Sequence, residues 1–149
     1  MFSIKIEAKG LKELRQNFQE LANSVDAQIK EDLEKYLNKV LLNQIRLNTP
    51  ILSGNLRESL TIQLRSLQKG RVGFNVISDL PYALRVHEEE RRLGPVSAIQ
   101  PEQPEGGVGN KFVERVVHYH AEEIRAVIGK APLVTVRKLY PSGAVRPLR

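Results

Sequence analysis

The sequence contains no cysteine and no tryptophan, and only three of its 149 residues are histidine. Without cysteine, disulfide scaffolds, thiolate zinc sites and cysteine nucleophiles are excluded. No apolar run approaches the roughly 18 residues that a membrane-spanning helix needs. Residues 1–5 also lack the apolar block of a signal peptide. We therefore expect a soluble protein that is made in the cytoplasm, has a mostly aliphatic core and has no membrane partner.

What is present is typical of a single globular domain. Apolar residues make up 41% of the chain and charged residues 27%, which argues against wholesale disorder. The formal net charge of +6 is concentrated in the last twenty residues, which contain no acidic side chain. Their basic residues are Lys130, Arg137, Lys138, Arg146 and Arg149. Such an end favours an anionic partner, either nucleic acid or an acidic protein surface, and the alternative is a solubilising tail.

Apolar periodicity in the first third of the chain predicts one strand and two helices. Residues 2–6 alternate apolar and polar side chains, which is typical of a strand with one buried face. Residues 11–21 have helical spacing and are followed by a predicted break at residues 23–24. A long amphipathic helix is then expected over residues 25–48. It should end there because residue 49 precedes Pro50, which disfavours helical geometry.

The middle of the chain predicts a β-hairpin and an irregular segment. Residues 60–65 and 72–76 alternate in the same way on either side of a glycine-containing turn, which indicates two antiparallel strands. A short helical turn is expected after Pro81. Residues 93–110 have no regular period and are rich in proline and glycine. A loop of that length is usually functional or mobile.

The last third of the chain predicts a helix and then a strand. Helical spacing returns at residue 111 and continues to residue 128. Gly129 and Pro132 are expected to end this helix. Residues 133–137 are then expected to form a short strand, followed by a tail that contains two further prolines.

Together these patterns predict an α+β fold. We expect a small antiparallel or mixed β-sheet packed against one long and two shorter helices, with a long Pro/Gly loop and an extended basic C-terminal arm. Residues 1–130 are expected to form a single globular domain in which the loop at about residues 93–110 is mobile. Residues 131–149 are expected to supply a C-terminal strand and the basic arm.

Catalytic and metal-binding patterns fail on spacing. His87 is followed by glutamates but not by the second histidine of a zinc-protease motif. His118 and His120 are about 200° apart around a helix and cannot share an ion there. The acidic run at residues 88–90 is expected to face solvent, and a metal-dependent nuclease using it is the remaining enzymatic alternative. We therefore expect no enzyme activity, no catalytic residues, no cofactor and no metal.

Three segments, taken in order, resemble the motifs of a known family. They are Thr49 to Ser59 (TPILSGNLRES), Tyr82 to Glu88 (YALRVHE) and Lys111 to Arg115 (KFVER). Their order and spacing are similar to those of tail-completion and head–tail joining proteins of tailed bacteriophages, also described as gene-ten-product-like tail components. The resemblance covers roughly residues 10–125. One departure is the sequence EERR at residues 89–92, where many relatives have Gly-Thr.

The resemblance marks a set of motif residues. These are Pro50, Gly54, Leu56, Arg57, Ser59, Tyr82, Ala83, Val86, His87, Glu88, Lys111 and Phe112. Several also have a physical role of their own: Pro50 stops a helix, and Gly54 can adopt positive φ without a steric cost. We expect Arg57 or Arg85 to pair with Glu88 or Glu114. The candidate subunit or partner contacts are Arg57, Tyr82, Arg85, Glu88, Lys130, Arg137, Lys138, Arg146 and Arg149.

The resemblance implies a structural protein of the virion neck. Such proteins form rings, commonly hexamers, which cap the head-proximal end of the tail tube and join it to the head connector. The implied partners are further copies of the chain, the tail tube protein, the head connector, the tail sheath and the genome DNA that passes through the channel. A head-closure or connector protein is the alternative within this class. A non-enzymatic DNA-binding protein is the alternative outside it.

Overall fold

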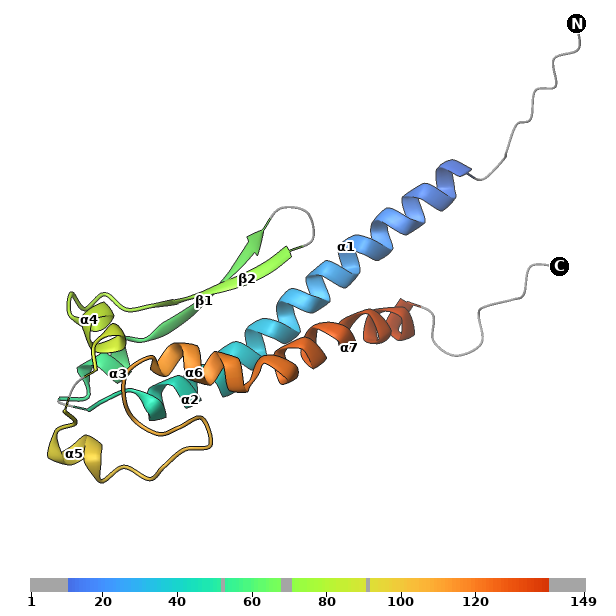
Figure 1. Cartoon of the computed structure of the whole chain (residues 1–149). Coiled ribbons are helices and arrows are strands. Elements are labelled where there is room, and N and C mark those ends of the chain that lie inside the picture. The colour runs from blue at the N-terminus through green and yellow to red at the C-terminus, as the bar shows by residue number, and fades with distance from the viewer. Residues whose placement is uncertain (1–10, 52, 68–70, 91, 140–149) are drawn as a thin grey trace, which may run out of the picture.

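The computed structural model describes residues 11–51, 53–67, 71–90 and 92–139. The strand predicted at residues 2–6, and Arg146 and Arg149, lie outside these ranges. The molecule is elongated, with a long helical rod, a second helix beside it and a hairpin along the same direction (Figure 1). The first residues of the rod and the last residues of the second helix lie at the same end of the molecule.

The rod is one continuous helix that changes its winding once. It consists of α1 (Leu11–Tyr36), a π-helical turn η1 (Leu37–Leu41) and α2 (Leu42–Asn48). The break predicted at residues 23–24 is wrong. Asn23 accepts a hydrogen bond from Gln19 one turn earlier, at 3.3 Å, and serine and asparagine cost a helix less than about 1 kcal/mol each. The predicted end at residue 48 is confirmed, because Thr49 is extended with φ −77° and ψ 133°.

Helix α7 (Ala121–Leu139) runs antiparallel to α1 and follows α6 (Phe112–Tyr119) after a single non-helical residue. The Tyr36 hydroxyl donates to the Glu123 carboxylate at 2.5 Å, and Lys138 Nζ donates to Gln28 Oε1 at 2.7 Å. The prediction that Gly129 and Pro132 end the helix is therefore wrong. The strand predicted at residues 133–137 is also wrong, because these residues belong to α7. Tertiary packing along α1 outweighs the roughly 3 kcal/mol that a proline costs inside a helix.

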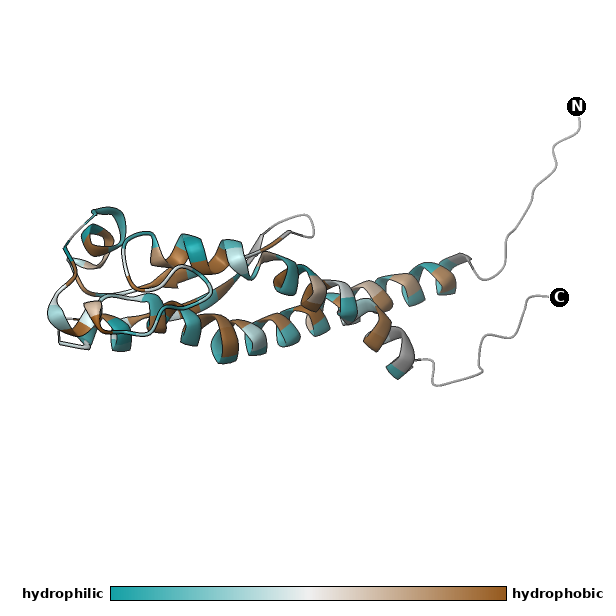
Figure 2. Ribbon diagram, turned by 60° about the horizontal axis from the view of Figure 1, so that its bottom comes forward, coloured by the Kyte–Doolittle hydropathy of each residue, from teal (hydrophilic) through white to brown (hydrophobic). Residues whose placement is uncertain are grey.

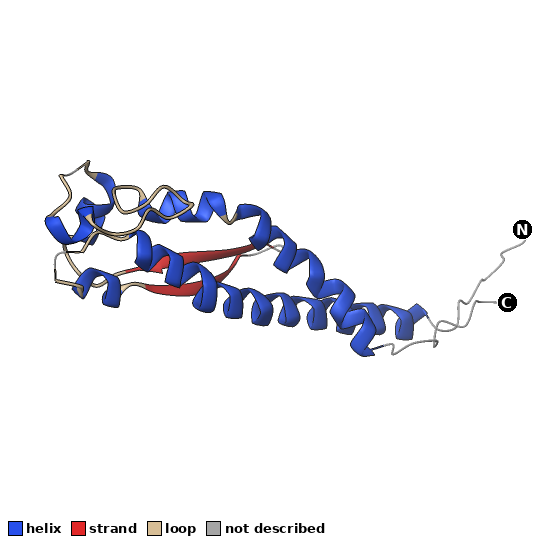
Figure 3. Ribbon diagram, turned by 90° about the horizontal axis from the view of Figure 1, so that it is seen from below, coloured by secondary structure: helices blue, strands red, loops and turns tan. Residues whose placement is uncertain are grey.

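The hairpin is confirmed. Strand β1 (Thr61–Leu67) pairs antiparallel with β2 (Arg71–Ile77), and Leu64 lies opposite Phe74. These two strands are the whole sheet in the described part of the chain. They lie lengthwise along the helices (Figure 3). Three short helices complete the order of elements, namely α3 (Asn55–Ser59), α4 (Ala83–Glu88) and α5 (Pro95–Ala98).

The hydrophobic core lies where the rod, the hairpin and α6 meet. Hydrophobic residues alternate with hydrophilic ones along these elements (Figure 2). Its buried members are Leu33, Leu37, Leu41, Leu42, Ile45, Leu60, Ile62, Phe112 and Val116. The α+β class, with one long helix and a small antiparallel sheet, is thus confirmed. Within the described ranges, no helix is both long and apolar enough to cross a membrane.

Candidate functional site

The first motif closes the end of the helical rod. The Arg57 guanidinium donates to the carbonyl oxygens of Thr49 and Leu47, at 2.9 and 3.0 Å. The Thr49 hydroxyl donates to the carbonyl oxygen of Ile45 at 2.7 Å. These bonds satisfy carbonyl groups that the end of a helix leaves without an internal partner. Partial burial lowers the pKa of Arg57. The predicted pairing of Arg57 with a glutamate is therefore wrong, because its side chain caps α2.

The rest of this motif connects the rod to the hairpin. Gly54 has φ +86°, a left-handed conformation that favours glycine, and α3 begins at the next residue. Leu56 is buried and precedes β1. The Ser59 hydroxyl donates to the Leu56 carbonyl oxygen and lies 2.7 Å from the Ser78 hydroxyl. Ser59 thereby joins the start of β1 to the segment that follows β2.

The second and third motifs contact each other directly, although they are more than twenty residues apart. The rings of His87 and Phe112 meet edge to face with centroids 4.9 Å apart. The Lys111 amide donates to the His87 carbonyl oxygen at 2.7 Å. Lys111 adopts φ +52°, and its ammonium pairs with Glu88 and Glu114. Lys111 and His87 lower the pKa of Glu88. The cation that pairs with both Glu88 and Glu114 is therefore Lys111, and the predicted pairing with an arginine is wrong.

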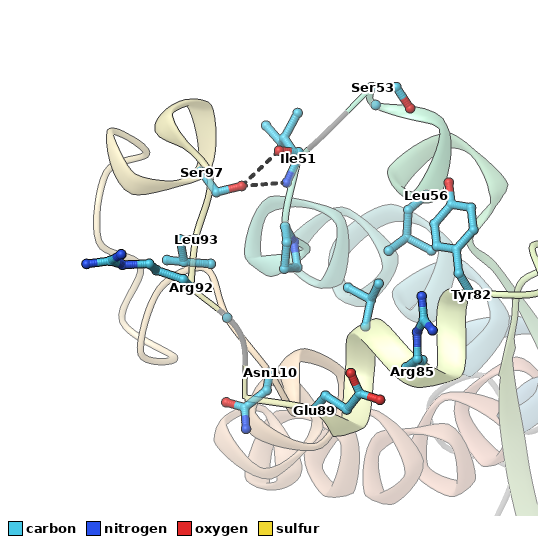
Figure 4. Close-up of a pocket in the computed structure, with 15 residues that line it drawn as sticks. Ile51, Ser53, Leu56, Tyr82, Arg85, Glu89, Arg92, Leu93, Ser97 and Asn110 are labelled. Carbon is cyan, nitrogen blue, oxygen red and sulfur yellow. Dashed lines mark hydrogen bonds between the residues drawn. The ribbon is translucent and has the colours of Figure 1, made fainter.

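The first and second motifs both line one pocket of about 380 Å³, in which Leu56 and Tyr82 lie side by side (Figure 4). The first motif contributes Pro50, Gly54 and Leu56, and the second contributes Tyr82 and Val86. The third wall comes from the proline- and glycine-rich loop. The other lining residues are Ile51, Ser53, Arg85, Glu89, Arg92, Leu93, Gly94, Ser97, Gly109 and Asn110. The structure therefore brings together motif residues that are about thirty positions apart in the sequence.

Ser97 fixes the loop wall against the first motif. Its hydroxyl accepts a hydrogen bond from the Ile51 amide at 2.8 Å and donates one to the Ile51 carbonyl oxygen at 3.0 Å, and it is 97% buried (Figure 4). The sequence interpretation missed Ser97 and the short helix α5 that carries it. The signal was present, because Pro95 follows Gly94 and proline favours the first position of a helix.

The glycine-rich run within the loop holds an arginine. The Arg115 guanidinium donates to the carbonyl oxygens of Gly107 and Asn110, at 2.9 and 3.1 Å. Gly106 has φ +105°, and a Cβ there would lie 2.8 Å from the Arg115 side chain. In a phosphate-binding loop, backbone amide groups point toward the anion. In this run, two backbone carbonyl oxygens accept hydrogen bonds from a cation instead, so the run does not have the geometry of a phosphate site.

A second polar cluster fixes the same loop to the helices. His120, which is 6% exposed, lies at the junction of α6 and α7. Its Nε2 is 3.0 Å from the buried Glu105 carboxylate, and its Nδ1 is 2.9 Å from Glu123 and 3.2 Å from the Tyr36 hydroxyl. Burial alone would lower the pKa of His120, but the two carboxylates raise it overall. This cluster was not predicted, since its members come from three separate segments.

Apart from Arg85, the described basic residues among the predicted contacts do not line the pocket. Lys130 and Lys138 are exposed on α7, which leads away from α4 and α5 (Figure 1). Arg137 lies in the same helix. Arg85 and Tyr82 do line the pocket. No three histidine, aspartate or glutamate side chains in the described ranges are arranged to hold a metal ion.

The lining of the pocket combines apolar surface with a few polar groups. Its walls are mainly apolar, and Tyr82 offers an apolar ring with a polar tip. Arg85 adds a guanidinium group, which is a donor suited to a carboxylate or a carbonyl group. The guanidinium of Arg92 is turned away from the other lining residues (Figure 4). The pocket thus has the apolar surface and the few polar groups that are typical of a ligand site.

Comparison with known proteins places these residues in context. The model of the family described as "Bacteriophage HK97-gp10, putative tail-component" matches residues 12–87. That range begins in α1 and ends in α4, so it includes the rod, the hairpin and two walls of the pocket. No curated protein and no solved structure matched the chain.

Proposed function

Because the chain belongs to the HK97-gp10-like family of bacteriophage tail components, we propose that it forms a ring at the head-proximal end of the tail. As a tail component, the protein has a structural role and belongs to the virion. The proposed ring is a hexamer located in the neck, where it caps the tail tube and joins it to the head connector. Further copies, the tube protein, the connector and the tail sheath are its partners, and DNA passes through its channel.

The observation that carries this proposal is the match over residues 12–87. The matched segment builds a rigid rod and places two walls of an anchoring pocket at the end of the molecule opposite the described ends of the chain. A ring subunit needs such a core, with exposed surfaces for its neighbours and for the layers above and below. We expect each contact to be weak in solution, so that the purified chain is mostly monomeric and the ring forms on its partner through multivalency.

Electron microscopy of lysates from the phage with this gene silenced tests the proposal. Overlong or variable tails are expected, because nothing would stop growth of the tube. Tails of normal length beside unattached, DNA-filled heads would instead indicate the head-closure alternative. Intact, infectious virions would contradict both structural roles.

A further inference from the structure

A groove of about 720 Å³ runs beside β2 on the other side of α4 from the pocket. Five consecutive residues at the end of β2 and just after it line the groove, from Phe74 to Ser78. A surface lined by consecutive residues of a strand follows the strand's edge as well as its face, because side chains alternate between faces. Its other lining residues are Leu60, Leu80, Pro81, Ala83, Leu84, His87, Glu88, Phe112 and Val113.

The edge of β2 is open to a further strand. Strand β2 pairs with β1, and no other strand in the described ranges pairs with it. A sheet of two strands is marginally stable, and an open edge presents unpaired amide and carbonyl groups. The apolar side chains beside this edge are also incompletely covered: Leu84 is 73% exposed and Ile77 is 37% exposed. Both features fit an extended apolar segment as the occupant.

The sequence outside the described residues contains one segment with this chemistry. Phe2, Ile4 and Ile6 alternate with Ser3, Lys5 and Glu7, so an extended conformation places three apolar side chains on one face. Residues 2–6 form a segment of five residues, which is the same length as the groove wall from Phe74 to Ser78.

The segment is too far away to enter the groove of its own chain. Arg46 Nη2 donates to the carbonyl oxygen of Leu60, one of the groove residues, at 2.9 Å. Arg46 lies 35 positions after Leu11 along the continuous rod, which corresponds to about 50 Å. The five residues from Ile6 to Leu11 span at most about 18 Å when fully extended. Even Phe2 reaches no further than about 32 Å.

We propose that residues 2–6 of one copy add as a third strand to the edge of β2 in a neighbouring copy, with their apolar side chains in the groove. This contact is heterologous, since each copy donates a segment and accepts another, and repeated contacts of that kind form a ring when the rotation between neighbouring copies closes. The proposal rests on the ring assembly proposed above and names the contact that makes it.

A labelled peptide tests the contact on the monomeric protein. A fluorescein-labelled peptide of residues 1–9 is titrated with the full chain carrying Ile4→Lys, whose own segment cannot compete. Saturable binding is expected, with a Kd below about 1 mM. Adding Leu84→Lys should weaken binding at least about tenfold, because that side chain would be buried under the peptide. Ile99→Lys is the matched control, since Ile99 is 81% exposed and lies outside the groove.

Mixing two defective chains tests whether the contact joins copies. Ile4→Lys leaves the groove intact, and Leu84→Lys leaves the N-terminal segment intact. Native mass spectrometry at high concentration should show each variant as a monomer and their mixture as a heterodimer. Heterodimer formation is expected only if the segment of one chain enters the groove of the other. Absence of saturable peptide binding, binding unaffected by Leu84→Lys, or no heterodimer in the mixture would overturn the proposal.

Complementation of the gene-silenced phage separates this contact from the wider function. If wild-type protein restores normal tails and both single variants do so equally well, the strand contact is wrong and the tail role stands. If silencing leaves tails and heads normal, the tail role fails regardless of peptide binding.

Discussion

At the scale of single residues, Gly54 and Gly94 on the wall of the pocket differ in their backbone conformation. Gly54 has φ +86°, whereas Gly94 has φ −67°. A Cβ at either position would meet no atom within 4 Å. Any difference between their alanine variants therefore reports backbone strain and not steric contact.

We expect Gly54→Ala to destabilise the protein by about 1–2 kcal/mol, because an L-residue pays that cost in the left-handed region. Gly94→Ala should be neutral or slightly stabilising, since alanine adopts its conformation freely and loses less entropy on folding. Urea unfolding of both variants measures the difference. Equal effects of the two substitutions would contradict the strained turn.

His120 predicts a pH dependence of stability. Burial lowers the pKa of His120, whereas the carboxylates of Glu123 and Glu105 raise it by more. The pKa in the folded state therefore lies above the ordinary value of about 6.5. The folded protein thus binds the proton more tightly than the unfolded chain does. The resulting stabilisation is fully present below about pH 6.5 and is lost as the pH rises through the raised pKa.

Urea unfolding of the wild type and His120→Gln between pH 6 and pH 9 measures this effect. The wild type should lose free energy of unfolding with rising pH relative to the variant, which has no titrating group at this position. His118→Gln is the control. His118 is exposed and lies two positions before His120, so we expect the stability of this variant to change with pH as that of the wild type does. Parallel curves for the wild type and His120→Gln would show that the cluster does not hold a proton.

At the scale of elements, the C-terminal region shows how packing overrides local preference. The segment at residues 133–137 is rich in β-branched residues and follows Pro132, so by itself it favours a strand. In the structure it continues α7, where Thr135 is 4% exposed. The helix accepts the proline because a neighbouring helix, α1, lies along its length.

This arrangement predicts that Pro132→Ala stabilises the protein by roughly 1–3 kcal/mol and raises its helical circular dichroism. Alanine restores the backbone donor and removes the clash of the proline ring with the preceding turn. Pro104→Ala, in the loop between α5 and α6, is the matched control and should leave the helical signal unchanged. No gain from Pro132→Ala would favour the strand that the sequence predicts.

At the scale of the whole molecule, the basic residues of α7 and the pocket are separated. The pocket lies at the end with α4 and α5, whereas Lys138, the basic residue of the predicted C-terminal arm whose side chain is described, is exposed on α7. We infer that this arm contacts an acidic protein surface of the tube or connector, because tight binding to DNA phosphates would hinder passage of the genome.

The purified chain is therefore expected to bind duplex DNA with a Kd weaker than about 1 μM at physiological salt, and any binding should fall steeply as salt is added. Fluorescence anisotropy at 50 and 200 mM salt measures both properties. Submicromolar binding that persists at the higher concentration would favour the DNA-binding alternative.

Local patterns were enough to determine much of this protein from its sequence. The end of the rod before Pro50, the hairpin, the short helix after Pro81 and the α+β class all follow from periodicity and from the geometry of proline and glycine. The motifs also identified the family, because their order and spacing are visible without a structure; the family match includes the first motif and nearly all of the second, and it ends before the third.

Only the tertiary structure decided which segments meet. It joined the short and the long helix expected before Pro50 into one rod, continued α7 through the predicted strand, and paired Lys111 with Glu88 and Glu114. It also brought Ser97 to Ile51 and Glu105 to His120. The positions of α7, Glu88, Ser97 and Glu105 depend on contacts between residues at least 15 positions apart, and the free energy of such contacts exceeds the small local preferences that the sequence displays.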